Sequence, residues 1–230
     1  TGTVLTGTGT VDFAGTHALT LAANFTLVAT VPAWSFSGTV TVASNNATVR
    51  TVTVGSGRSL GLSGDTVSAS VNLTNQGTLT ASGSTINGAL ANAGTVTVQG
   101  GTASAFNGAF SNALGATLEV FSTSTVLTVA SGFTNAGRIV MDDKNASRHP
   151  VTLTVSAETL ANTGTIQTTD TSGDNDAGGG VNTLTLNAQV TNTGTLDIDQ
   201  SLAIVTGTGK TFDTTSGAID VACHPKSRVW

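Results

Sequence analysis

A five-residue pattern, Asn-x-Gly-x-aliphatic, recurs along the chain and restricts its fold more than any other feature. It begins at Asn75, Asn92, Asn135, Asn162 and Asn192, and a longer variant of it begins at Asn112. The intervals between successive asparagines are 17, 20, 23, 27 and 30 residues. Recurrence on a scale of about twenty to thirty residues is typical of solenoids, in which each repeat forms one turn of a coil.

Each glycine of the pattern is followed by a short segment in which aliphatic residues alternate with polar ones, as in Thr95–Val98 and Leu196–Ile198. A second alternating segment, such as Val151–Val155, follows in several repeats. Alternation with a period of two places the aliphatic side chains on one face of a β-strand. No segment has the pattern of an amphipathic helix, and the frequent Gly, Asn and β-branched residues oppose one.

Short parallel strands without helical crossovers predict an all-β fold, a right-handed parallel β-helix (β-solenoid) of roughly ten coils. The aliphatic residues that follow the repeated glycines should form one inward column, made of Leu79, Val96, Leu118, Ile139, Ile166 and Leu196. The growing intervals predict loops of increasing length at the side of the coil, the longest being residues 170–180.

The Asn and Gly of the pattern are predicted to supply a left-handed backbone bend at the same corner of every turn. Asparagines stacked at that corner should also hydrogen-bond to one another along the rod. The repeats predict a single domain over residues 1–222, with looser repeats in 1–70 and clear ones in 71–222. Residues 223–230 depart from the pattern and are predicted to be a tail or cap. Because repeats are present from the first residue, we expect an internal piece of a longer protein.

Composition limits the classes of partner. Charged residues make up 9% of the chain, against about 25% in ordinary domains, and the net charge is −5. There is no basic cluster, so we expect no nucleic-acid partner. No apolar stretch is long enough to span a bilayer, so we expect no membrane insertion by this segment. The single cysteine, Cys223, permits no intrachain disulfide.

The segments Leu160–Ile166 and Val190–Leu196 resemble the repeats of filamentous-haemagglutinin-type exoproteins and autotransporter adhesin passengers. The resemblance covers residues 71–200 well and residues 1–70 loosely. It implies a stalk or passenger segment of a large secreted bacterial adhesin, located outside the cell or on its surface. The implied partners are a host or neighbouring cell surface, through a glycan or protein receptor, and further repeats of the same larger chain.

Catalysis is the first alternative, because polysaccharide lyases and hydrolases also use β-helices and need clustered acids, often with a Lys or Arg base. The densest cluster is Met141–Pro150, which contains Asp142, Asp143, a lysine, an arginine and a histidine. A solvated loop between two strands is the preferred interpretation. We therefore predict that the chain is not an enzyme, with no catalytic residue, cofactor-binding residue or metal ligand.

Three places in the sequence contain groups that could bind a metal ion. Residues 170–176 contain three aspartates and an asparagine that could gather oxygen ligands for calcium, but their spacing matches no known calcium loop, and a flexible acidic loop is preferred. Asp197 and Asp199 should face outward side by side from one strand, where they need not bind a cation. His17, His149 and His224 lie too far apart in sequence for a histidine site. Trp34 is interpreted as core or end cap.

Ice binding is the second alternative, because several Thr-x-Thr pairs should point their hydroxyl groups outward from strands. A flat rank of such pairs requires threonines on one face of nearly every coil, whereas Leu118–Val120, Ile139–Met141 and Leu196–Ile198 interrupt the rank. Threonine also suits exposed strand positions in general, and this explanation is preferred. The pairs begin at Thr39, Thr51, Thr78, Thr95, Thr152 and Thr183.

Overall fold

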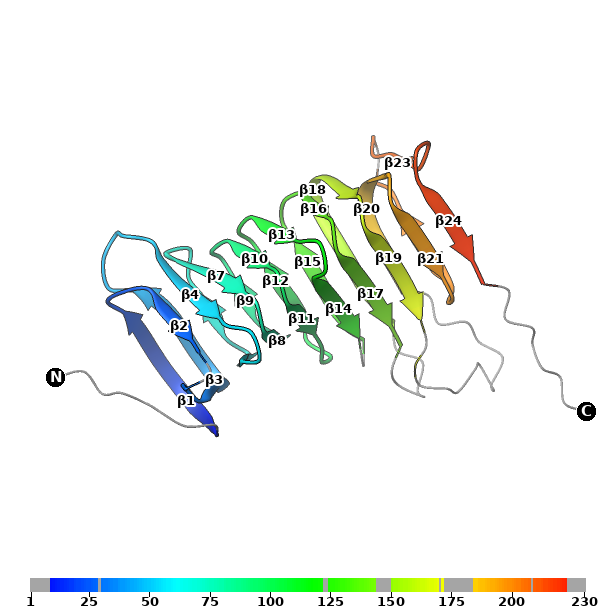
Figure 1. Cartoon of the computed structure of the whole chain (residues 1–230). Coiled ribbons are helices and arrows are strands. Elements are labelled where there is room, and N and C mark those ends of the chain that lie inside the picture. The colour runs from blue at the N-terminus through cyan, green and yellow to red at the C-terminus, as the bar shows by residue number, and fades with distance from the viewer. Residues whose placement is uncertain are drawn as a thin grey trace, which may run out of the picture.

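The structure is a computed structural model that describes residues 9–28, 30–121, 124–143, 150–169, 171, 184–207 and 209–222. Successive turns of the chain stack from the N-terminal to the C-terminal end into a rod (Figure 1). The described residues form strands and connecting turns and contain no helix. The predicted all-β parallel β-solenoid is confirmed, and its count of about 8 turns differs only slightly from the predicted number of roughly ten. At about 4.8 Å for each turn, the rod is roughly 40 Å long.

Each full turn contributes strands to three faces of the rod, and every strand pairing between turns is parallel. Face 1 carries the strand that follows the repeated glycine. From the N-terminal end, its strands are the first part of β1 (Thr10–Leu21) and of β3 (Ala33–Ser44), then β5 (Ser59–Ser63), β8 (Thr78–Ser82), β11 (Thr95–Val98), β14 (Thr117–Phe121), β17 (Arg138–Asp142), β19 (Thr165–Thr169), β21 (Thr195–Ile198) and β24 (Ala218–Val221).

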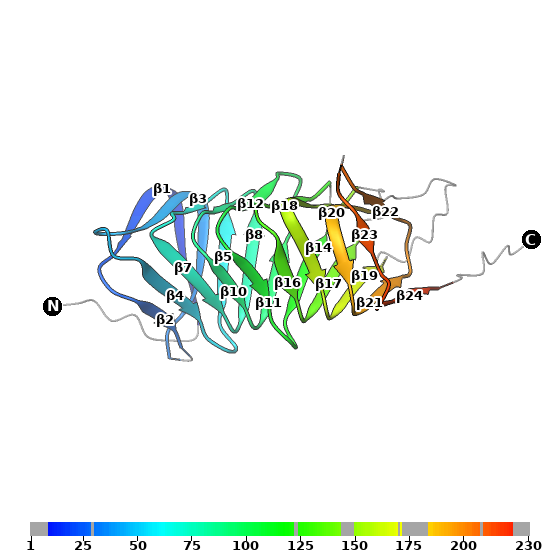
Figure 2. The same ribbon diagram turned by 90° about the horizontal axis from the view of Figure 1, so that it is seen from above.

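Faces 2 and 3 complete each turn, as seen when the rod is viewed from above (Figure 2). Face 2 consists of the second part of β1 and β3, then β6 (Thr66–Val67), β9 (Thr85–Ile86), β12 (Ser104–Phe106), β15 (Val126–Val129), the first part of β18 (Thr152–Asn162) and of β20 (Leu184–Asn192), and β22 (Leu202–Val205). Face 3 consists of β2 (Phe25–Leu27), β4 (Arg50–Val54), β7 (Val71–Asn75), β10 (Leu90–Asn92), β13 (Phe110–Asn112), β16 (Phe133–Asn135), the last part of β18 and β20, and β23 (Phe212–Asp213).

The core is a stack of aliphatic columns in strict register. On face 1 the predicted inward column is confirmed, since each of its members pairs with the next and is at most 1% exposed. The column continues to Leu60 on one side and ends at Ile219, which is 48% exposed. Alternation in the sequence therefore fixes which side chains enter the core.

The interval between repeats grows mainly at the corner between face 1 and face 2. The connection runs from Ser82 to Thr85 in the first half of the chain, but from Asp142 to Thr152 and from Thr169 to Leu184 further on. The expectation that insertions fall between strands that stay in register is confirmed, and residues 170–180, the predicted longest loop, lie outside the described residues apart from Thr171. The corners between faces 2 and 3 also vary, but less. β18 and β20 run through them, with a register shift between Thr154 and Thr159, whereas separate connections lead from Ser44 to Arg50 and from Val205 to Phe212.

The repeated asparagines form the predicted hydrogen-bonded column, which lies inside the rod at the corner between face 3 and face 1. In every asparagine but the last, Asn192, the Nδ2 group donates to the Oδ1 atom of the asparagine in the next turn, at 2.6–2.8 Å. The same Nδ2 groups also donate to a main-chain carbonyl of the next turn, such as that of Thr95 or Thr117. All six side chains are at most 1% exposed. They are Asn75, Asn92, Asn112, Asn135, Asn162 and Asn192.

The predicted left-handed bend at this corner is wrong for most of the repeats. No asparagine of the column has a positive φ, and among the glycines of the pattern only Gly115, in the longer variant, has one (80°). The other glycines are needed because a Cβ atom would come within 3.0 Å of main-chain atoms of the preceding turn. These glycines are Gly77, Gly94, Gly137, Gly164 and Gly194.

The N-terminal end of the core is closed by aromatic rings. Trp34 stacks on Phe25 with ring centroids 4.5 Å apart and meets Phe13 edge to face at 5.5 Å. Trp34 is 8% exposed, so its interpretation as a core or end-cap residue is confirmed. At the other end Ile219 and Val221 of β24 are 48% and 60% exposed.

Candidate functional site

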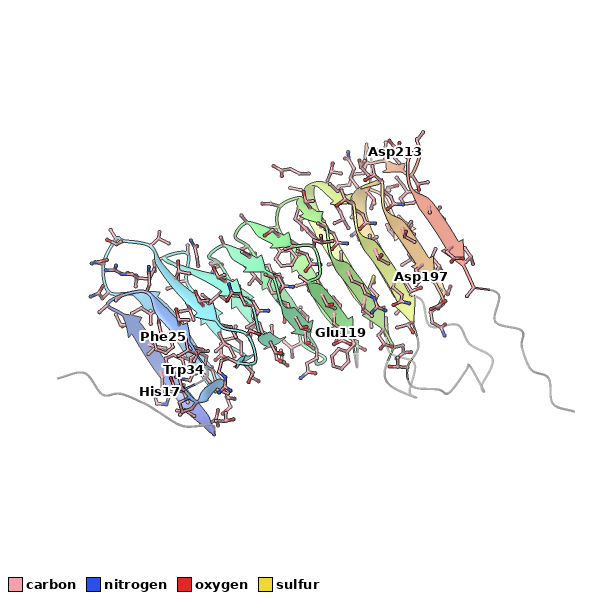
Figure 3. The ribbon with its side chains drawn as sticks, in the orientation of Figure 1. His17, Phe25, Trp34, Glu119, Asp197 and Asp213 are labelled. Carbon is pink, nitrogen blue, oxygen red and sulfur yellow. The ribbon has the colours of Figure 1, made fainter. Side chains whose placement is uncertain are left out.

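The outward side of face 1 carries acidic, basic, amide and hydroxyl side chains on successive strands. Strand register places Thr80, Thr97, Glu119, Val140, Gln167, Asp197 and Asp220 in one row across successive strands. A parallel row holds Thr78, Thr95, Thr117, Arg138, Thr165 and Thr195. Glu119 on β14 and Asp197 on β21 mark the first row in Figure 3.

A groove with a volume of about 330 Å³ crosses four strands of this face, from β11 to β19. We call it the polar groove. It is lined by Thr95, Thr117, Glu119, Arg138, Val140, Asp142, Gln167, Thr169 and Thr171. Because its lining comes from four successive turns, the groove runs along the rod axis.

Hydrogen bonds between turns hold the groove's polar side chains. Nη2 of Arg138 donates to Oε1 of Gln167 in the next turn. Nε2 of Gln167 in turn donates to Oδ2 of Asp197, at 2.8 Å, and more weakly to Oδ2 of Asp199, at 3.4 Å. On the other side, Oγ1 of Thr97 lies 3.5 Å from Oε2 of Glu119. The outward positions of the groove are therefore linked from turn to turn, which limits their rotamers.

Asp142 and Asp143 do not lie in a solvated position, so the preferred interpretation of the Met141–Pro150 cluster is wrong at these two residues. Each is only 1% exposed. Asp142 ends β17, lines the groove, and accepts hydrogen bonds from the main-chain N–H of Thr171 at 3.0 Å and from its hydroxyl at 2.8 Å. Met141 points into the core and is fully buried. The cluster's lysine, arginine and histidine lie outside the described residues.

The other candidates for metal binding are not brought together in the part of the chain that the structure describes. Asp197 on β21 and Asp199 just beyond its end both accept from the Gln167 amide, so their predicted position side by side is confirmed, although only Asp197 belongs to the strand. His17 is exposed at the N-terminal end, where its Nε2 lies 2.6 Å from the carbonyl oxygen of Ala14. Within that part of the chain, no three His, Cys, Asp or Glu residues form a group that could hold a metal ion. The acidic segment 170–176, apart from Thr171, lies outside it, as do His149, His224 and the segment 223–230.

The Thr-x-Thr pairs are distributed over all three faces. The pairs at Thr78 and Thr95 lie on face 1, the pair at Thr51 on face 3, and the pair at Thr152 on face 2. On face 1, Glu119, Arg138 and Val140 follow the threonines directly in register. The predicted interruption of the rank is confirmed. Thr183 lies outside the described residues.

One further carboxyl group is buried, in the corner between β5 and β6. Asp65 is 1% exposed, and its carboxylate accepts hydrogen bonds from the main-chain N–H groups of Val40, at 2.9 Å, and Ser63, at 2.5 Å. Burial raises the pKa of Asp65 above its ordinary value, although these two hydrogen bonds act to lower it. Asp65 does not line the groove. Its main-chain N–H donates to Oγ of Ser84 in the following turn, at 3.1 Å, so Asp65 ties three turns together.

Comparisons with known proteins place the chain in no family. No family model matches the sequence, no curated protein matches it, and no solved structure matches its fold. Among the described residues there is also no helix with the length and hydropathy of a membrane span. The groove and the rod are therefore interpreted from their own chemistry.

The sequence contains information that locates the groove, but only when the repeats are aligned on their asparagines. The outward row lies five residues after Asn92, Asn135, Asn162 and Asn192, which gives Thr97, Val140, Gln167 and Asp197. Reasoning from local clusters missed Glu119, Arg138 and Gln167, because they are far apart in the sequence. Together the lining offers carboxylate acceptors, guanidinium and amide donors, and hydroxyl groups that do both.

Proposed function

We propose that this chain is a structural stalk or passenger segment of a large secreted bacterial adhesin, which presents a stiff rod and its side loops at the cell surface. The observation that carries the proposal is the continuous asparagine column, which links six successive turns inside the rod. The resemblance of the Asn-Thr-Gly repeats to those of secreted adhesins supports the same role.

The arrangement of the insertions also supports presentation. The longest of them fall at one corner of the rod, between faces 1 and 2, while the strands within each face stay paired in register. A rod that keeps its stack while one corner varies can carry different loops at fixed spacing. The partners we infer are a receptor on a host or neighbouring cell and further repeats of the same larger chain.

Surface exposure on intact cells tests this proposal. An epitope tag placed in the 172–183 segment of the full-length protein should bind antibody on unpermeabilised cells, or in the culture medium. Beads coated with the purified chain should adhere to cells, and beads coated with a Leu196→Asp variant should not, because its core is disrupted. Labelling only after cell lysis would contradict the proposal.

A second candidate is a polysaccharide-active enzyme, and the groove is the observation that favours it. Glu119 and Asp142 supply acids beside the Arg138 guanidinium, and acids with a base are what such enzymes need. We nonetheless favour the non-enzymatic rod, because both Asp142 and Gln167 already hold structural hydrogen bonds. Turnover of pectin, alginate or a similar polymer that disappears in Asp142→Ala would establish the enzyme instead.

Ice binding is the least supported of the three functions. It requires a flat threonine face, and the pairs divide among three faces and meet charged residues on face 1. Thermal hysteresis by the purified chain would favour ice binding over the other two functions.

A further inference from the structure

The polar groove has features that a spacer does not need, and they suit one class of ligand. We propose that the groove binds a neutral saccharide chain that lies along the rod axis. The proposal goes beyond the rod function, because stiffness depends on the interior of the rod and the groove lies on its outside. The stiffness of the rod therefore does not depend on a ligand in the groove.

The shape of the groove fits a linear chain rather than a compact ligand. Its lining extends over four strands, from Thr95 on β11 to Gln167 on β19. Three strand spacings of about 4.8 Å give a length of roughly 15 Å, which is enough for several sugar units. Its volume of about 330 Å³ is at the lower end of the range for ligand sites.

The floor of the groove is apolar and its walls are polar. Val140 occupies an outward position between Glu119 and Gln167 in register, yet it is only 7% exposed. An aliphatic floor of this kind suits the C–H face of a sugar ring. The walls carry acceptors on Glu119, donors on Arg138 and both on the threonine hydroxyls, which matches the mixed donors and acceptors of sugar hydroxyl groups.

The walls are also held in place before a ligand arrives. The bond from Arg138 to Gln167 uses only part of the guanidinium, which has five N–H donors. Gln167 is fixed in turn by Asp197, at 2.8 Å. Side chains that are already ordered lose less conformational entropy when they bind a ligand.

Charge selects a neutral ligand over an anionic one. Among the described lining residues, Glu119 and Asp142 contribute two carboxylates against the single cation of Arg138. Asp197 and Asp199 follow on the same face, and the whole chain has a net charge of −5. This excess of negative charge disfavours a polymer of uronic acids or sulfated sugars relative to a neutral one.

Isothermal titration of the full chain with oligosaccharides tests the proposal. The probes are β-1,4-linked hexasaccharides of glucose, mannose, xylose and N-acetylglucosamine, with α-1,4-linked hexagalacturonate as the anionic counterpart. At least one neutral probe should bind saturably, with little dependence on salt, and hexagalacturonate should bind at least tenfold more weakly.

Two groove variants with matched controls locate the binding. Gln167→Ala removes one wall and should weaken binding at least tenfold, whereas Gln76→Ala removes an exposed amide on another part of the rod and should not. Thr117→Gln extends a side chain into the groove and leaves the Arg138–Gln167–Asp197 bonds in place. It should also weaken binding at least tenfold, whereas Thr53→Gln on face 3 should not.

Three results would overturn the proposal. They are the failure of every neutral probe to bind, tighter binding of hexagalacturonate than of any neutral probe, and unchanged binding in groove variants that melt like the wild type. None of these results bears on surface exposure of the rod, so the two proposals succeed or fail separately.

Discussion

The side-chain amide of Asn112 donates a 2.7 Å hydrogen bond to the side-chain oxygen of Asn135, which occupies the same corner one turn further along the rod. The same Nδ2 group donates to the main-chain oxygen of Arg138 at 3.1 Å. Both asparagines are at most 1% exposed. An amide in such a place would be costly without partners, so each turn of the column depends on its neighbours.

Replacing Asn135 with alanine should therefore destabilise the rod by about 2–4 kcal/mol. The change removes the bonds from Asn112 and to Asn162 and Thr165, and it takes away the donor to the buried Oδ1 atom of Asn162. Urea unfolding followed by far-UV circular dichroism measures the loss.

Asn107→Ala is the matched control. Asn107 also donates its amide to an asparagine of the preceding turn, Asn87, at 2.8 Å, but this pair is exposed to solvent. Its loss should cost less than about 0.5 kcal/mol, as is usual for surface substitutions. Equal losses of stability in the two variants would show that the buried asparagine column stabilises the rod no more than an exposed asparagine pair does.

Gly164→Ala should lower the free energy of unfolding by about 1–3 kcal/mol, the usual cost of overpacking. The Cβ atom would meet the main-chain oxygen of Gly137 and main-chain atoms of Ala136, which cannot move without disturbing the stack. Gly207→Ala is the control, since its Cβ would meet only Lys210, at 3.9 Å, and its φ is not left-handed. Thermal melts of both variants show whether Gly164 is needed because a Cβ atom would meet the preceding turn or because of its backbone conformation.

The sequence was sufficient to predict the inward column and the asparagine column, because both depend on the repeat alone. Leu118 and Ile139 alternate with outward residues, and the asparagines recur at each corner. The role of Gly164 was not predictable in the same way. It depends on how closely the main chain of one turn approaches the next, which is a property of the stack and not of any single repeat.

The groove escaped prediction for a related reason. Glu119, Arg138 and Gln167 are unremarkable in their local sequence, and they become neighbours only through the register of three turns. The burial of Asp142 was missed because a run of charged residues at the end of a strand usually marks solvent. Here Thr171, two residues beyond the end of β19, donates two hydrogen bonds to the Asp142 carboxylate.

Asp65 should make stability depend on pH. Burial holds the pKa of its carboxyl above the ordinary value of 3.8, so the folded state binds the proton more tightly than the unfolded chain. The stability that this proton contributes is fully present below about pH 3.8 and is lost as pH rises through the folded pKa. Asp65→Asn should remove this part of the pH dependence when unfolding is measured from pH 3 to pH 7.

Asp213→Asn is a control in which the pH dependence of stability should change in the opposite direction. Hydrogen bonds from the hydroxyl and the main-chain N–H of Thr215 lower the pKa of Asp213. Its contribution is present above the unfolded pKa and is lost as pH falls through the folded pKa. A change of the same sign in both variants would contradict the assignment at Asp65.

A charge in the inward column should be costly in the middle of the stack and cheap at its end. Leu196 is fully buried, and Leu196→Asp should cost several kcal/mol, about the cost of an unpaired buried charge. Ile219 pairs with Leu196 in the next strand of the same column but is 48% exposed. Ile219→Asp keeps its carboxylate in contact with water, so it should cost less than about 1 kcal/mol. Urea unfolding of the two variants at pH 7 measures the difference, and comparable losses would mean that β24 is covered in solution by a further layer.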